Sequence, residues 1–599
     1  MIKTLRELLN RILLSRYFYF IQLLAMAIWG AQLLNTDSYY VNYLLLLIFV
    51  AICVYENSRN SERLFHIFSG KYQSCILCFF SFLFSSMILF ANYKLWDFTD
   101  KPEEFGYTFM RVYKACLMLT FFCGGFFAFS NVFYVAIKKC DQFFWRRSKK
   151  PVSSQNVFWI SFFLLVITRL LVLFLCQYPG ELTPDSMSQM SQAVDGKFSN
   201  HHPFYHTLVI KCFVDIGMAL FNDINAAVAT YSFFQVIFTA MCFSFAVSTM
   251  AMMVAPRWII ALSILFYVFM PYHIVYAITM WKDIMFGCFV LLLIVTSYRC
   301  LMSLGNHILN YVLLSFSGLG VCLFRSNGYF VFAISAISYL VCCMLKNRKM
   351  IVIFTVTLVI AFFMKHTVLE KIGVTQPDTI EALSIPAQQI ARVVHDGCEL
   401  TEWEWDALSE IIDIEEISDH YSAYISDPIK DLVRAKGNQQ LILDKKSKYI
   451  KLYVSLGLRY PREYLLAWID QTRGYWNAGY DYWIWDLDIC ENSLSIERTI
   501  RSGLLDRMLK EYLWLFTNVE ILRLFLSVGL FVWIDIMMLM VALLRKDKAG
   551  VFISLPILAV VSSLLVATPV FSELRYIYSV FCALPIIVVI VLRPSKLAL

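Results

Sequence analysis

The chain has 599 residues, of which 59% are hydrophobic and only 16% are charged. Soluble globular proteins are typically about 45–50% apolar and about 25% charged. This composition excludes a soluble enzyme, a disordered chain and a nucleic-acid-binding domain. A helix that crosses a bilayer needs about 20 apolar residues, and roughly half of the chain can supply such helices. We therefore expect a mainly α, polytopic membrane protein with one folded segment outside the bilayer.

Apolar runs along the chain predict about 14 transmembrane helices. We expect them at residues 17–34, 41–56, 73–92, 108–137, 157–177, 226–254, 258–272, 284–298, 307–323, 328–345, 350–364, 516–544, 551–568 and 576–592. These runs divide the chain into four parts. They are an N-terminal four-helix addition (1–150), a transmembrane core (151–364) with a large loop at 178–225, a small domain (365–515) and three C-terminal helices (516–599).

Lys and Arg cluster beside alternate apolar runs, and such clusters mark the cytoplasmic side of a membrane protein. The run from Lys138 to Lys150 is the strongest of these anchors. The pattern predicts a multi-pass protein of a cell membrane, the bacterial plasma membrane being the expected one, with both termini cytoplasmic and residues 365–515 extracytoplasmic. The net charge of +7 then reflects the Lys and Arg residues that set the orientation of the protein in the membrane, and no nucleic-acid partner is expected.

The loop at 178–225 carries polar residues next to a predicted membrane border. Pro179-Gly180 indicates a turn, and Pro184 permits a helix start with Asp185 in its first turn. Gln189 would follow Asp185 at the i+4 position of that helix, and His202 lies farther along the loop. The pattern favours a functional carboxylate at Asp185, and a helix cap at the surface is the alternative explanation.

Three more charged clusters fall on the same predicted side of the membrane. They are Lys282-Asp283 at the start of one run, Arg325 between two runs, and Glu573 with Arg575 between the last two. Each could be an isolated ion pair or a charge that reaches the interface, but together they form a constellation at one membrane edge. Arg169, late in the fifth run, would either reach outward or pair with one of these carboxylates.

This inventory fits the transfer of a sugar from a lipid phosphate. A carboxylate can take the proton of an acceptor hydroxyl. Arginines can hold a leaving phosphate and stabilise its developing charge.

The sequence resembles the GT-C glycosyltransferases, which are multi-spanning enzymes that use polyprenyl-phosphate sugars, and more closely a bacterial GT-C-like family. The resemblance covers roughly residues 155–595. It rests on Tyr178 to Gln189, His202-Pro203, Trp281-Lys282-Asp283, Arg325 to Gly328, Ile385 to Arg392, and Glu573 to Tyr576.

The resemblance implies a role for each matching residue. Asp185 would be the catalytic base and Asp283 a second acidic catalytic residue. Arg575 and Arg325 would bind the donor phosphate, and His202 would position the substrate. From the charged and polar inventory we also expect Lys282 to bind the donor phosphate, and Gln189 and Glu573 to position the substrate.

No cofactor is certain from this pattern. Because Asp185 is followed by Ser186 and not by a second carboxylate, the sequence departs from the better-known GT-C pattern. A divalent metal (Mg²⁺ or Mn²⁺) could still bind Asp185, Asp283 and Glu181, since hard cations require several oxygen ligands. Cys398 and Cys490 could pair if the predicted outer compartment is oxidising.

The sequence thus predicts a membrane glycosyltransferase that moves a sugar from a polyprenyl-phosphate donor to a cell-surface glycan acceptor. Aromatic residues between Tyr475 and Trp485 would either bind the acceptor or form the core of the 365–515 domain. Two alternatives stay open. One is a lipid-linked saccharide flippase or polysaccharide exporter, and the other is a non-catalytic membrane assembly protein.

Overall fold

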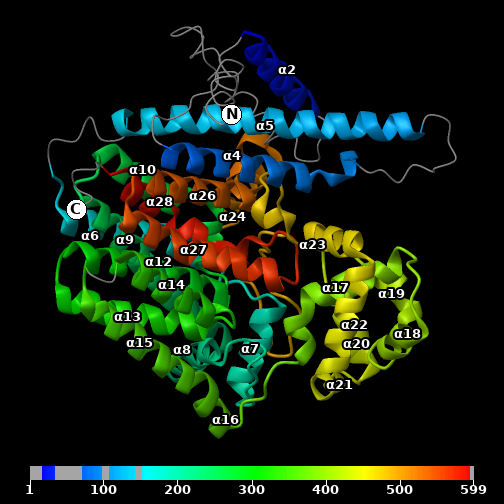
Figure 1. The fold of residues 1–599 in the computed structure, drawn as a ribbon. Helices are drawn as coiled ribbons and strands as arrows, with labels where there is room; N and C mark the ends of the chain where they lie inside the picture. Colours follow the sequence, from blue (N-terminus) through cyan, green and yellow to red (C-terminus); the bar gives the residue numbers. More distant parts are fainter. Residues whose placement is uncertain (1–15, 34–70, 97–106, 144–150, 344–345, 594–599) are drawn as a thin grey trace.

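The computed structural model describes residues 16–33, 71–96, 107–143, 151–343 and 346–593 (Figure 1). Helices supply nearly all of the regular structure in these ranges, which contain isolated β-bridges but no β-strand. Among them, ten helices are long and apolar enough to cross a membrane, or eleven if one bent pair counts as a single span. The protein is therefore a helical, multi-pass membrane protein.

The main bundle surrounds α12 (Lys282–Met302), which is buried along almost its whole length. Its neighbours include α9 (Ile224–Met252), α13 (His307–Phe324), α27 (Lys548–Ala567) and α28 (Tyr578–Leu592). The remaining long helices of the bundle are α6 (Ser154–Leu175), α8 (Phe204–Phe221), α14 (Gly328–Cys343), α15 (Arg348–Phe363) and α26 (Val528–Leu544). A central helix without an exposed face explains why its sequence is apolar all round.

Shorter helices complete this part of the chain. They are α7 (Pro184–Asp195), α10 (Arg257–Phe269), α11 (Pro271–Val275), η2 (Met364–Val368), α16 (Leu369–Ile372), α24 (Gly503–Asn518), α25 (Glu520–Arg523), η4 (Leu524–Leu526) and η5 (Leu574–Ile577).

The N-terminal helices lie against one side of this bundle. They are α2 (Arg16–Leu33), α4 (Lys71–Ala91), η1 (Tyr93–Trp96) and the long α5 (Tyr107–Phe143). Figure 1 shows α5 and α4 side by side along the top of the molecule. Trp29, Phe84 and Phe129 share a hydrophobic cluster with Trp533 of α26, so aromatic packing joins this part to the bundle.

A separate lobe lies to the right in Figure 1 and comprises residues 379–459. It contains η3 (Thr379–Leu383), α17 (Ser384–His395), α18 (Glu402–Ser409), α19 (Ile414–His420), α20 (Asp427–Lys436), α21 (Gln440–Asp444) and α22 (Lys446–Arg459). These helices form a hydrophobic cluster that is distinct from that of the bundle. The following helix, α23 (Pro461–Trp476), packs on both α17 and α26 and so connects the lobe to the bundle.

An ionic network strengthens this connection. Arg392 of α17 lies 2.6 Å from Asp470 of α23, and the Tyr93 hydroxyl donates to the same carboxylate at 2.8 Å. Both Asp470 and the nearby Arg473 are almost fully buried. The lobe, α23 and the N-terminal helices therefore meet at one buried group of charges, which Arg392 of the predicted Ile385–Arg392 motif joins.

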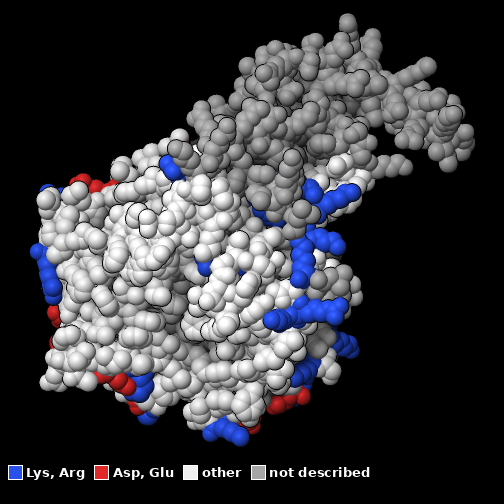
Figure 2. Space-filling model, turned by 90° about the vertical axis from the view of Figure 1, so that its left-hand side faces the viewer, with Lys and Arg blue, Asp and Glu red and all other residues white. Residues whose placement is uncertain are grey.

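The surface in Figure 2 has a broad area without charged side chains, with Lys and Arg gathered along one of its edges. Single helices also expose large apolar residues, such as Phe163 and Ile167 on α6 or Val352 and Val359 on α15. In a chain with ten apolar helices such a surface is typical of contact with lipid.

The predicted set of fourteen spans differs from these helices at several places. The run at 41–56 lies outside the described residues. The runs at 258–272 and 328–345 correspond to α10 and α14, which are shorter than a full span. The run at 516–544 is not one helix, because the chain bends by 64° between Glu520–Leu526 and Val528–Leu544.

The largest difference concerns the loop at 178–225, which contains α8, an 18-residue apolar helix long enough to cross a membrane. The sequence analysis missed it because Lys211 and Asp215 interrupt its apolar run. In the structure these two residues form an i,i+4 ion pair at 3.1 Å on one face of α8, which lowers the cost of carrying both charges on an apolar helix.

Candidate active site at the start of α7

The turn before α7 has a geometry that only glycine accepts. Gly180 has a φ of +131°, and a Cβ atom there would collide with the Ser232 hydroxyl of α9. The chain therefore approaches α9 closely at this point. Next to it, the Glu181 amide donates to the Ile278 carbonyl at 2.9 Å, and the Met280 amide donates to the Glu181 carbonyl at 3.1 Å. These bonds align the start of α7 with the chain that leads into α12.

Two side-chain hydrogen bonds complete this alignment. The Trp281 indole donates to the Thr183 hydroxyl at 2.7 Å, and the Ser186 hydroxyl donates to the Met280 carbonyl at 2.9 Å. Helix α7 begins at Pro184 with Asp185 in its first turn, as the sequence predicts. Asp185 thus lies between two residues that are both bonded to the start of α12, and this places it beside Lys282.

Two cations contact one oxygen of the Asp185 carboxylate. Nη1 of Arg575 lies 2.9 Å and Nζ of Lys282 lies 3.3 Å from Oδ2. Among the described residues no hydrogen bond to Oδ1 is found, and the Asp185 side chain is 34% exposed. Partial burial opposes the charged form, but Lys282 and Arg575 more than offset it and hold the pKa of Asp185 well below its ordinary value. Asp185 is therefore ionised at neutral pH.

Arg575 connects several parts of this site. It also pairs with Glu573, which is almost fully buried. Its guanidinium lies 4.9 Å from the ring centre of Trp281 and 5.7 Å from that of Trp483. Burial raises the pKa of Glu573, and the charge of Arg575 opposes that rise. Arg575 is thus fixed by two carboxylates and by cation–π contacts.

A second ion pair lies next to the first. Nη1 of Arg325 is 2.8 Å from Oδ1 of Asp283, which is buried in the first turn of α12. The same nitrogen donates to the Tyr576 carbonyl at 3.0 Å, and both Arg325 and Arg575 lie near the Tyr576 ring. The N-terminal end of α12 also favours the Asp283 carboxylate through its dipole. Tyr576 thus joins the two ion pairs into one cluster.

His202 is the neutral member of the cluster. Lys282 donates to its Nδ1 atom at 3.0 Å. Since an ammonium group can only donate, Nδ1 accepts and the neutral ring carries its proton on Nε2. Burial and the charge of Lys282 lower the pKa of His202 to about 3, so the ring stays uncharged at neutral pH.

Gln189 points away from this charged cluster. Its amide donates to the Thr207 hydroxyl at 2.8 Å and lies 3.0 Å from His206 Nδ1, both on α8. The other nitrogen of His206 is 2.8 Å from the Tyr231 hydroxyl of α9, which donates to Gln235 at 2.8 Å. The structure therefore brings seven of the eight predicted residues together and places Gln189 in a buried network behind them.

Gln235 is a site residue that the sequence analysis did not find. Its amide donates to the carbonyls of Tyr276, Ala277 and Thr279, at 3.0, 3.2 and 2.7 Å. These bonds hold the turn that leads into α12, whose first two residues are Lys282 and Asp283. A lone Gln within an apolar run is a signal for such a role, because a buried amide needs partners.

The other candidate residues have different surroundings from those expected. Arg169 neither reaches outward nor pairs with a carboxylate of the cluster, since it is buried and donates to the Thr239 hydroxyl and the Tyr267 carbonyl. Cys398 and Cys490 are both free thiols, so the pairing considered for them does not occur. Tyr475 and Trp476 are buried packing residues, whereas Trp483 lies near Arg575 at the cluster.

The carboxylates considered for a metal do not form one group. Asp185 and Asp283 face cations, while Glu181 accepts from the Thr279 hydroxyl at 2.6 Å and burial raises its pKa. In the described part of the chain, no group of three or more His, Cys, Asp or Glu side chains could hold a metal ion.

The fold and the site define the class of the protein. It is a helical multi-pass membrane protein with a largely buried cluster of ion pairs at the starts of α7 and α12 and at η5. A model described as a family of unknown function, DUF6020, matches residues 187–598. This is more than half of the chain, and the protein therefore belongs to this family. The match begins two residues after Asp185 and includes the other residues of the cluster. No curated protein matches, and no solved structure matches.

Proposed function

We propose that the protein is a membrane glycosyltransferase that moves a sugar from a polyprenyl-phosphate donor to a cell-surface glycan acceptor on the extracytoplasmic face. The observation that carries the proposal is the contact of Asp185 Oδ2 with Arg575 and Lys282. It joins a carboxylate that can accept a proton to two cations that can bind a phosphate. The resemblance to GT-C enzymes agrees with this assignment.

The ion pairs explain how Asp185 could become a base only when the donor is bound. With both cations on its carboxylate, Asp185 is a weak base. A donor phosphate that binds Arg575 and Lys282 would compete with Asp185 for them. The carboxylate would then regain basicity, and Oδ1, to which no hydrogen bond is found among the described residues, could accept the proton of the acceptor hydroxyl.

The remaining residues support this chemistry. Arg575 and Arg325 would stabilise the charge that develops on the leaving phosphate. Glu573 and Asp283 hold these two arginines in place. Trp483, 37% exposed and near Arg575, offers a ring face on which a sugar could stack.

One observation favours an exporter of lipid-linked saccharides as the second candidate. Asp535 lies within α26, after the 64° bend, and is almost fully buried. Neither of its oxygens has a hydrogen-bond partner among the described residues. A buried carboxylate on a broken helix is typical of transporter sites. If export is the function, Asp535→Asn abolishes it and Asp185→Asn does not.

The test is the surface glycan of cells that carry Asp185→Asn as their only copy. The proposal predicts a glycan that lacks one sugar and a lipid-linked precursor that accumulates. Asp195→Asn is the matched control, because Asp195 is an exposed residue at the other end of α7. An unchanged glycan and unchanged carrier turnover in Asp185→Asn cells would contradict the enzyme.

A further inference from the structure

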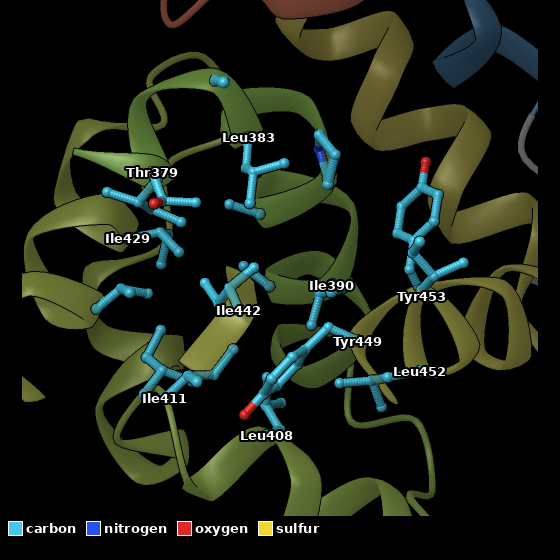
Figure 3. A pocket seen from close by; sticks show the side chains of 18 of the residues that line it. Thr379, Leu383, Ile390, Leu408, Ile411, Ile429, Ile442, Tyr449, Leu452 and Tyr453 are labelled. Carbon is cyan, nitrogen blue, oxygen red and sulfur yellow. The ribbon is translucent and has the colours of Figure 1, made fainter. Parts of the chain in front are cut away.

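The lobe contains a cavity of about 410 Å³ that is separate from the charged cluster (Figure 3). Its lining comes from all seven helices of the lobe, and Figure 3 shows side chains such as Leu383, Ile390 and Ile442 around a common space. The volume lies within the range of about 300–1,000 Å³ that is typical of small-molecule sites.

The lining is almost entirely hydrocarbon. Most lining residues are Ile, Leu, Val and Ala. The two tyrosines direct their hydroxyls to partners on the protein: Tyr449 donates to Glu410 at 3.2 Å, and Tyr453 donates to Gln389 at 2.6 Å. Both tyrosines line the cavity, and neither leaves its hydroxyl without a partner. Water is poorly accommodated in such surroundings, and so is a peptide, whose backbone needs hydrogen-bond partners.

One stretch of α21 and α22 combines exposed apolar residues with a cation. Leu443 and Ile450 line the cavity and are 40% and 62% exposed. Lys446 lies between them in sequence and also lines the cavity. Its neighbours Lys445 and Lys448 pair with Glu410, whereas no ion pair of Lys446 is found among the described residues. The cavity is thus reached past an apolar rim that carries one available ammonium group.

We propose that the lobe binds a single-chain anionic lipid, with its aliphatic chain in the cavity and its acidic head group at Lys446. The apolar lining explains the preference for a flexible hydrocarbon chain, and Lys446 explains the preference for an anionic head group. The head group is a phosphate or a carboxylate, and both would bind Lys446 through charge-assisted hydrogen bonds. This inference does not depend on the proposed catalysis.

The test is photo-crosslinking of the full chain in membrane vesicles. The two probes are a sixteen-carbon alkyl phosphate and a sixteen-carbon fatty acid, each with a diazirine near the end of the chain. The proposal predicts cross-links within residues 379–391 and 442–453, found by peptide mass spectrometry. Each probe is then competed with an excess of unlabelled alkyl phosphate or of unlabelled fatty acid. The unlabelled lipid that lowers the cross-link yield more strongly identifies the preferred head group.

Two variants and a control make the result specific. Ala387→Phe puts a ring into the cavity, where it takes the space of the lipid chain. It should lower the cross-link yield about tenfold, because overpacking of this kind weakens binding by an amount that corresponds to about one order of magnitude in affinity. Lys446→Gln should also lower the yield, while Lys451→Gln should not, because Lys451 lies over the Trp403 ring. Asp185→Asn should leave the yield unchanged, which separates this proposal from the catalytic one.

Cross-links confined to the bundle helices would overturn the proposal. So would cross-links in the lobe that neither Ala387→Phe nor an excess of unlabelled lipid reduces. Competition by unlabelled lipid uses the unaltered chain, so it decides the question even if Ala387→Phe fails to fold.

Discussion

Nη1 of Arg575 lies 2.9 Å from Oδ2 of Asp185, although 390 positions separate the two residues in the sequence. This contact joins the first turn of α7 to η5, the short helix just before α28. It brings together the carboxylate and the guanidinium that the proposed reaction requires.

Removal of Arg575 should destabilise the protein because it leaves Glu573 without its partner. Breaking a buried pair typically costs about 3–5 kcal/mol, so Arg575→Gln should lower the melting temperature of the purified protein clearly. The double variant Arg575→Gln, Glu573→Gln should recover much of this loss but no transfer activity. A double variant that melts no higher than the single variant would contradict the pairing.

Lys282 should act on catalysis more than on stability. Loss of one donor that stabilises a developing charge costs about 10²–10³ in kcat, and Lys282→Gln should lower the rate of sugar transfer by about 10²-fold. Lys197→Gln is the matched control, since Lys197 is exposed in the loop after α7. Equal rates for both variants, measured with saturating donor, would exclude Lys282 from the site.

His202 should make stability depend on pH. Its pKa is about 3 in the folded protein and about 6.5 in an unfolded chain. The unfolded state therefore binds more protons between these values, and stability should fall as the pH decreases through this range, by up to about 1.4 kcal/mol per pH unit.

The measurement is the melting temperature between pH 4.5 and 7.5. His202→Asn should reduce the dependence on pH, whereas His201→Asn, which replaces the exposed neighbouring ring, should keep it. Equal slopes for the two variants would show that His202 is not the buried neutral group.

Gln235 should be a positioning residue. Gln235→Leu removes the side-chain donor from three carbonyls of the turn before α12. The Thr279 and Tyr276 carbonyls still accept backbone N–H groups, but no other donor to the Ala277 carbonyl is found among the described residues, and an unsatisfied buried group costs about 1–3 kcal/mol. We expect a lower melting temperature and a reduced kcat with little change in the KM for the donor. Thr230→Val should behave as the unaltered protein, because the one hydrogen bond found for the Thr230 hydroxyl among the described residues goes to the Ala226 carbonyl of the same helix.

The sequence predicted much of the site because charged residues are rare in a membrane protein. Asp185, Lys282, Arg325 and Arg575 could be selected by their position beside apolar runs. The start of α7 could be predicted from Pro184 for a similar reason, since it depends on local backbone preferences.

The sequence did not predict contacts between distant segments. Two examples depend on how α7, α8 and α9 pack. One is the set of bonds from Gln235 to the turn before α12, and the other is the contact of Gln189 with α8. Helix α8 was missed because Lys211 and Asp215 interrupt its apolar run. Their pairing becomes apparent only if the segment is already taken as a helix, which places the two side chains one turn apart. The lobe cavity likewise forms from seven short helices, none of which shows it alone.

The most direct test of the account is sugar transfer by the purified chain in lipid vesicles. The substrates are a polyprenyl-phosphate that carries a labelled sugar and a glycan acceptor prepared from cells that lack the protein. The account predicts labelled glycan and free polyprenyl phosphate with the unaltered chain and with Asp195→Asn, and loss of both with Asp185→Asn, by about 10²–10⁴-fold if Asp185 is the general base. Equal release of polyprenyl phosphate by the Asp185→Asn variant would contradict it.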